Sequence, residues 1–209
     1  MPSLYAKILA DIRFHDLLLD CDRDLATERQ RQCCANCGAR LDVANFNRKP
    51  RGRPLKLGRE HDRRFSFCCR RDGCRSRATP PSLRFLGRRV YVAAIVVLIA
   101  ILQSGANASR LERLAAIVPV PPRTIARWRR WWRDTFTATP FWQLARARFM
   151  PPVEPERLPD SLLDRFTGTP EACSQHDERD RLVALLRFIG PITGGSSRQP
   201  GGLTTNHAR

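Results

Sequence analysis

Two short cysteine motifs lie in the first half of this chain, with residues 38–68 between them. The first is Cys34-Ala-Asn-Cys37 followed by Gly38, and the second is Cys69-Arg-Arg-Asp-Gly-Cys74. Two thiolates on one tight turn can hold a tetrahedral metal ion, and glycine after the second cysteine permits the positive φ that such a turn needs. The two motifs therefore predict one structural zinc (Zn²⁺) site with four cysteine ligands, whose binding supplies much of the folding free energy.

Neighbouring residues leave this ligand set open to alternatives. Cys33 precedes Cys34 and Cys68 precedes Cys69, so Cys68 could replace Cys69 as the partner of Cys74. His61 is a weaker substitute, expected in a solvent-facing loop. The thiols could also be ordinary buried residues, or a redox pair, although no βαβ pattern surrounds the Cys-x-x-Cys motif. The spacing from Cys69 to Cys74 makes the tighter loop, and we expect that pair.

A second chemical signal follows at 109–137, where two helices are predicted to flank a short turn. Ser109 and Glu112 form a capping box at the start of the first helix, 109–118. Pro119 ends that helix, and Pro121 or Pro122 supplies the fixed φ favoured in the first turn of the next. The pattern predicts a helix-turn-helix, with the apolar helix 88–103 as the scaffold helix against which the pair packs.

The second helix of the pair, 122–137, has two different faces. Ile125, Trp128 and Trp132 recur at helical spacing and are expected to face the core. The N-terminal residues of such a helix reach base edges in the major groove of DNA. Those residues are Arg123, Thr124 and Arg127, while Arg129, Arg130 and Arg133 are better placed for phosphates. The alternative is a helical hairpin with a cationic exterior and no groove contact.

A basic loop lies between the two cysteine motifs. Pro50-Arg51-Gly52-Arg53-Pro54 matches the core of an AT-hook, which places arginine in a narrow minor groove. The match covers only five residues, and a loop of a zinc ribbon needs Gly and Pro in any case. With or without groove insertion, we expect phosphate contacts from four residues: Arg48, Lys49, Arg51 and Arg53.

The charge of the chain is concentrated in its middle. The net charge is +17, and residues 31–90 alone hold 17 basic and 4 acidic side chains, while residues 1–30 and 151–209 each have more acidic than basic ones. A concentrated basic block implies a polyanionic partner. No signal-peptide pattern begins the chain, and the apolar stretch 90–102 is shorter than the about 20 residues that cross a bilayer. We therefore expect a cytoplasmic, nucleoid-associated protein with no membrane partner.

These observations predict a mainly α fold with a small β zinc ribbon, in which the ribbon precedes a three-helix helix-turn-helix. The expected segments are an acidic N-terminal helix (1–32), the ribbon with its basic loop (33–84), the helix-turn-helix domain (85–150), a Pro-rich linker with short helices (151–192) and a disordered tail (193–209).

The order of motifs over residues 33–137 resembles the N-terminal DNA-binding region of zinc-ribbon transposases, and small proteins of bacterial mobile elements. The resemblance implies that Cys34, Cys37, Cys69 and Cys74 bind zinc. It also implies that Arg123, Thr124 and Arg127 face DNA. Two departures stand out: Pro119 replaces the usual glycine of the turn, and no strand-borne carboxylates follow the helix-turn-helix.

The sequence thus predicts a zinc-dependent, sequence-specific protein that binds double-stranded DNA without catalysis, as a regulator or accessory factor of a mobile element. This role also allows a protein partner, which could be a transposase, a recombinase or a second copy of the chain. One alternative is a transposase or recombination enzyme, or a remnant of one, that acts with a partner catalytic chain. The other is a zinc-ribbon RNA-binding protein.

Overall fold

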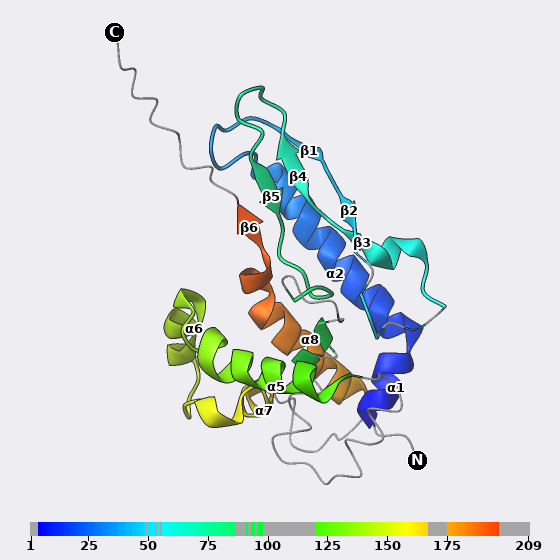
Figure 1. Ribbon diagram of the computed structural model, residues 1–209, viewed down its shortest axis with the longest axis vertical. Helices are drawn as coiled ribbons and strands as arrows, with labels where there is room; N and C mark the ends of the chain where they lie inside the picture. The colour runs from blue at the N-terminus through cyan, green and yellow to red at the C-terminus, as the bar shows by residue number, and fades with distance from the viewer. Residues whose placement is uncertain are drawn as a thin grey trace.

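A computed structural model describes residues 4–48, 50–52, 54, 56–86, 91, 93–94, 96–97, 120–166 and 175–196. These residues form an elongated molecule with a small sheet at one end and a group of helices at the other (Figure 1). The apolar side chains gather in two clusters that match these two ends. We call them the ribbon core and the helical core.

Two helices begin the described chain, α1 (Leu4–Ala10) and α2 (Ile12–Arg31). They meet at Asp11, whose carboxylate accepts a hydrogen bond from the backbone N–H of Arg13 and so caps α2. The first half of α2 contributes Phe14 and Leu18 to the helical core, and its second half contributes Ala26 to the ribbon core. One helix therefore supports both ends of the molecule.

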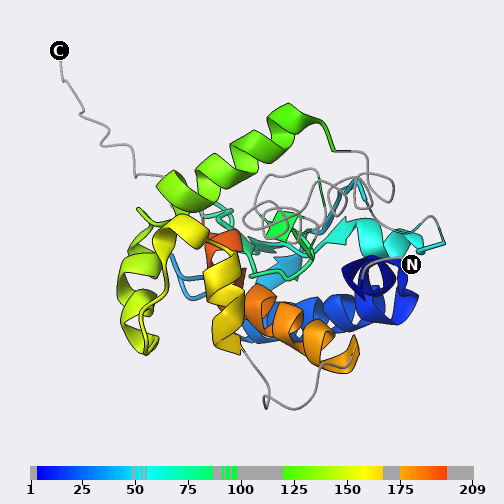
Figure 2. The ribbon, with the colours of Figure 1, turned by 90° about the horizontal axis from the view of Figure 1, so that it is seen from below.

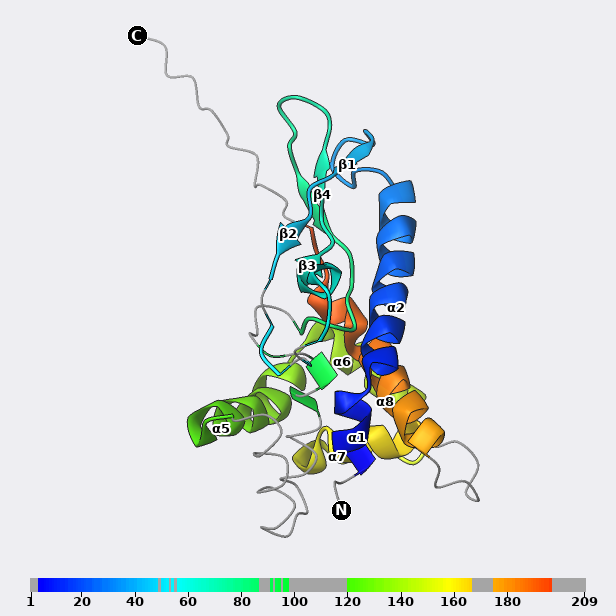
Figure 3. The same ribbon diagram turned by 90° about the vertical axis from the view of Figure 1, so that its right-hand side faces the viewer.

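The sheet is antiparallel, in the order β1-β4-β5-β6. Its strands are β1 (Leu41–Val43), β4 (Phe67–Cys69), β5 (Arg77–Thr79) and β6 (Gly195–Ser196). A separate pair, β2 (Phe46–Asn47) with β3 (Arg63–Arg64), closes the basic loop, and the short helix η1 (Arg59–Asp62) precedes β3. One face of the sheet packs on α2 through Leu41, Phe67 and Ala78 (Figure 3).

The helical end begins with α5 (Pro122–Arg130), which continues as a π-helical stretch, η2 (Trp131–Phe136). Pro122 occupies the first turn of α5, as predicted. The elements that follow are α6 (Pro140–Ala145), η3 (Arg146–Arg148), η4 (Pro155–Arg157), α7 (Asp160–Leu163), η5 (Asp164–Phe166), α8 (Gln175–Ile189) and η6 (Gly190–Thr193). Seen from below, α5 lies on the opposite side of the molecule from α2 and α8 (Figure 2).

The segment 151–192 contains short helices, as predicted, but it packs on the rest of the described chain, and so does the start of the predicted tail. Val153, Leu158 and Leu162 lie between the prolines and are buried in the helical core. Within the predicted tail, β6 pairs with β5 in the ribbon sheet. The prolines and glycines there interrupt regular structure. The aliphatic residues between them are nevertheless buried, because removing apolar surface from water is favourable. Residues 197–209 lie outside the described part.

The described residues confirm a partly helical fold with a small antiparallel sheet. The predicted helix 109–118 lies outside them, as does most of 88–103, of which Ala93, Ala94, Val96 and Val97 are helical and buried. The three-helix helix-turn-helix thus stays a prediction. Among the described helices, none has the length and apolar character needed to cross a membrane.

Candidate metal centre and nucleic-acid interface

The structure brings together the four cysteines chosen from the sequence. Each of Cys34, Cys37, Cys69 and Cys74 offers an Sγ atom, and all four atoms lie within 4.8 Å of one another. The Sγ atoms of Cys34 and Cys74 are 3.8 Å apart, and those of Cys37 and Cys69 are 3.4 Å apart. A tetrahedral zinc ion with Zn–S bonds of about 2.3 Å separates its sulfurs by about 3.8 Å. The cluster therefore fits a four-coordinate metal ion.

The first two sulfurs come from a turn directly after α2. The backbone N–H of Cys34 donates to the carbonyl of Ala39, and the N–H of Gly38 donates to the carbonyl of Cys34, both at 2.8 Å. Gly38 has a φ of +72°, the left-handed conformation predicted for the residue after the second cysteine. This turn holds Cys34 and Cys37 with both side chains on the same side.

The second turn repeats this arrangement after β4. The N–H of Cys69 donates to the carbonyl of Ser76 at 2.9 Å, as Cys34 does to Ala39 in the first turn. Arg75 follows Cys74 with a φ of +42°, so it takes the place that Gly38 has after Cys37. Gly73 also has a positive φ, in the Asp-Gly turn that the sequence indicated. The left-handed Arg75 was not foreseen, because arginine does not favour that conformation.

Hydrogen bonds to the sulfurs favour thiolates at this site. The pKa of Cys34 is lowered, chiefly because the backbone N–H of Asn36 donates to its sulfur. The pKa of Cys74 is lowered to about 5 by hydrogen bonds from the Ser76 hydroxyl and the Asn36 amide, each 3.3 Å away. Burial raises the pKa of Cys69 to about 12, and a coordinated cation removes the proton from such a thiol. Sequence reasoning did not find Asn36 and Ser76, the small polar residues beside the ligands.

The alternative ligands lie elsewhere. Side chains alternate along β4, so Cys69 is buried toward α2 while Cys68 is on the outer face of the sheet. The sulfur of Cys33 is 3.7 Å from the carbonyl of Arg31. His61 is buried, contrary to the solvent-facing position expected, and its Nε2 is 3.2 Å from an Asp16 carboxylate oxygen. The described residues therefore favour the predicted set of four.

The helix α5 has the two faces that the sequence predicted. Trp128 and Trp132 are buried in the helical core, and Ile125 is partly buried against it. Arg123, Arg127, Arg129 and Arg130 of α5 and Arg133 of η2 are exposed, with Thr124 half-buried. Asp134 is 3.2 Å from Arg133; in the described chain the other four arginines have no carboxylate within ion-pair distance. A dense positive charge therefore faces solvent on α5 and η2.

The basic loop adjoins α5 through one residue. Arg51 is exposed and forms a parallel bridge with Tyr91, whose ring is 5.1 Å from that of Trp128. Arg48 is half-buried, with its guanidinium 5.8 Å from the centre of the Phe85 ring. Arg48 is thus less accessible than expected. The other two predicted contact residues of the loop, Lys49 and Arg53, lie outside the described residues.

A buried polar joint, which sequence reasoning missed, links the ribbon to the helical end. Asp22 on α2 is fully buried and accepts hydrogen bonds from the Ser82 hydroxyl, the Leu83 backbone N–H and the Arg84 guanidinium. Arg84 also donates to the carbonyls of His61 and Arg63. The signal was present: Asp22 falls four residues after Leu18, on the apolar face of α2. The joint ties α2 to the segment after β5 and to β3.

Comparisons with protein-family models, with curated proteins and with solved structures find no match for this chain. The protein has a four-cysteine candidate metal centre at the end of α2. The same helix also packs against the helical end of the molecule, which includes the exposed basic helix α5.

Proposed function

We propose that this protein is a zinc-dependent, sequence-specific DNA-binding protein that acts without catalysis, as a regulator or accessory factor of a mobile element. The observation that carries the proposal is α5 with its continuation η2, a helical stretch anchored by the buried Trp128 and Trp132 that exposes five arginines. A helix held rigidly by large side chains and charged on its free face suits insertion into the major groove.

Zinc is the metal that the site suits best. Four thiolates in a tetrahedral arrangement select zinc or iron–sulfur chemistry over magnesium and calcium, which prefer oxygen ligands. A bound Zn²⁺ with four thiolates leaves a charge of −2. Arg70, Arg71 and Arg75 lie in and beside the second turn and offset that charge. The role of the ion is structural, because four protein ligands leave no open coordination position.

On α5, the residues near the N-terminus are the candidates for base recognition. Arg123 and Arg127 can each form two hydrogen bonds to guanine, and Thr124 can contact either kind of base. Arg129, Arg130 and Arg133 lie further along the helix, where phosphate contacts fix its register. Arg51 of the adjacent basic loop extends this surface toward a neighbouring groove or its phosphates.

Selection of bound sequences from a random pool of duplex DNA, followed by affinity measurement at fixed salt, tests the function. Arg127→Ala should weaken binding to the selected sequence by about 1–3 kcal/mol and relax its specificity. Arg146→Ala, an exposed arginine on η3, removes the same charge away from α5 and should have little effect.

Three results would contradict the proposal. Failure to enrich any sequence removes sequence specificity. Tighter binding to structured RNA than to duplex DNA at the same salt assigns the basic surface to RNA instead. Metal-dependent strand cleavage by the purified protein would make it an enzyme.

A further inference from the structure

The ribbon carries a second basic surface at the opposite end of the molecule from α5. We call it the ribbon surface, and it consists of Arg40, Arg70, Arg71, Arg75 and Arg77, all of them exposed. Two acidic residues accompany it: Asp42 is 3.1 Å from Arg70, and Asp72 is 3.5 Å from Arg75. Among the described residues, no carboxylate lies within ion-pair distance of Arg40, Arg71 or Arg77. Counted with the −2 charge of a zinc-loaded site, the ribbon surface keeps a small excess of positive charge, carried by Arg40, Arg71 and Arg77.

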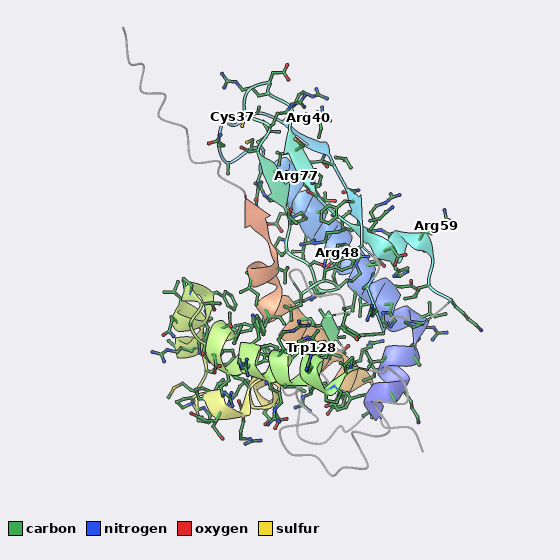
Figure 4. The ribbon with its side chains drawn as sticks, viewed as in Figure 1. Cys37, Arg40, Arg48, Arg59, Arg77 and Trp128 are labelled. Atoms are coloured by element: carbon green, nitrogen blue, oxygen red, sulfur yellow. The ribbon has the colours of Figure 1, made fainter. Side chains whose placement is uncertain are left out.

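Arg77 lies on the free side of the sheet. Asp42, Cys68 and Arg77 are cross-strand neighbours on β1, β4 and β5, and they alternate with the buried residues Leu41, Cys69 and Ala78. Because the buried residues pack on α2, Arg77 projects to the other side. Arg40 and the turn after β4 are at the same end of the molecule (Figure 4).

The ribbon surface and α5 are on the same side of the molecule. In Figure 3 the sheet and α5 both lie to the left of α2, with α5 extending furthest from it. The view from below agrees, because α5 is again separated from α2 and α8 (Figure 2). A straight duplex placed along this side runs past both the sheet and α5.

The two ends of the molecule are joined by α2. Phe14, near the start of α2, contacts the helical core that holds α5, and Cys34, just beyond its end, belongs to the metal centre. A helix of 20 residues is about 30 Å long, at about 1.5 Å per residue. One turn of B-DNA is about 34–36 Å. The length of α2, which runs from the helical end toward the ribbon, is therefore comparable to one turn of a duplex.

We propose that the ribbon surface is a second phosphate-binding surface for the same DNA duplex, about one helical turn away from the groove that α5 contacts. The inference rests on the proposed function, since it takes α5 as the primary contact. Arginines that contact phosphates release condensed counterions, so each contact adds to the salt dependence of binding. The ribbon surface adds affinity without adding base specificity.

Duplex length separates this second contact from the first. The full-length, zinc-loaded protein is titrated with two duplexes that carry the same selected site, one of about 10 base pairs and one of about 30, because one turn is about 10 base pairs. The double variant Arg71→Ala/Arg77→Ala should bind the short duplex like the unmodified protein. On the long duplex its salt slope should be smaller by about 1.8, the share of two phosphate contacts.

Matched variants complete the experiment. Arg23→Ala/Arg31→Ala removes the same charge from the exposed side of α2 and should change binding to neither duplex. Zinc content confirms that each variant keeps its ribbon. Arg127→Ala should weaken binding to both duplexes.

Each other outcome has one meaning. If Arg71→Ala/Arg77→Ala binds the long duplex as tightly as the unmodified protein, the second surface is wrong and the proposed function stands. If it weakens binding to both lengths equally, the ribbon surface lies beside α5 on the DNA, and the spacing of one turn is wrong. If Arg127→Ala has no effect on either duplex, the failure is that of the proposed function.

Discussion

The rings of Tyr91 and Trp128 meet edge to face, with their centres 5.1 Å apart and their planes at 82°. Tyr91 also pairs through its backbone with Arg51 of the basic loop. One aromatic contact therefore connects the loop between the cysteine motifs to the helix that carries the densest charge. The loop and α5 come from distant parts of the chain, and this contact lets them act as one surface.

The Tyr91–Trp128 contact predicts a measurable coupling energy. Tyr91→Leu and Trp128→Leu should each destabilise the fold, and the double variant should lose less than the sum of the two by about 0.5–1.5 kcal/mol, the value of an edge-to-face pair. Chemical denaturation of the four proteins measures this. Phe166→Leu serves as the control partner for Tyr91, because its ring packs on Phe149 and Phe188 instead. Additive losses in the Tyr91–Trp128 cycle would show that the contact contributes nothing.

The cysteine cluster predicts which thiols carry metal. The purified protein should contain about one zinc ion per chain. Cys34→Ser should lose it and unfold the ribbon, because a structural site gains its folding free energy from the metal. Cys33→Ser and Cys68→Ser should keep it, since these sulfurs lie outside the group of four. Elemental analysis of the three variants decides the ligand set, and metal loss in Cys68→Ser would instead support its pairing with Cys74.

The metal centre could be predicted because it depends on interactions between residues that are close along the chain. Cys34, Cys37, Cys69 and Cys74 are candidate ligands that the chain places in tight turns, and a turn depends on a few neighbouring residues such as Gly38. The same holds for α5, where Pro122 marks the start and the tryptophan spacing marks the buried face. Such features can be found from a single sequence because the interactions that make them are close along the chain.

Long-range contacts explain what was missed. β6 joins β5 across more than a hundred residues, and a segment with Gly194 and Gly195 has no strand signal of its own. Arg64 is buried because its guanidinium donates to the carbonyls of Pro80 and Thr193, which the sequence separates from it. These partners are defined only by the packed structure, so composition alone indicated a linker and a tail.

The buried joint predicts a large and asymmetric cost of substitution. Asp22→Asn leaves the buried Arg84 guanidinium without its counter-charge and should destabilise the fold by about 3–5 kcal/mol. Asp20→Asn on the same helix breaks an exposed pair with Arg23 and should cost less than about 1 kcal/mol. Urea unfolding of both variants measures the difference. Equal and small losses of unfolding free energy would mean that water reaches the joint and that the Asp22–Arg84 pair contributes no more than an exposed ion pair.

Two buried histidines predict a loss of stability in mild acid. Burial lowers the pKa of His15 and of His61 below 6.5, the latter although Asp16 is beside it. A histidine whose pKa is lower in the folded state binds its proton more readily when unfolded. Its contribution to stability is therefore complete above about pH 6.5 and falls as the pH drops from there through the folded pKa.

The variant His15→Gln isolates this effect. The Nε2 atom of His15 is 2.9 Å from the carbonyl of Leu9, and a glutamine amide can donate the same hydrogen bond without titrating. Unfolding free energies at pH 8 and pH 5.5 should therefore differ less in His15→Gln than in the unmodified protein. Both proteins keep the four cysteines, so the pH dependence of metal binding cancels in the comparison. If the two proteins lose equal stability between these pH values, His15 is not protonated on unfolding, and the acid sensitivity belongs to other groups.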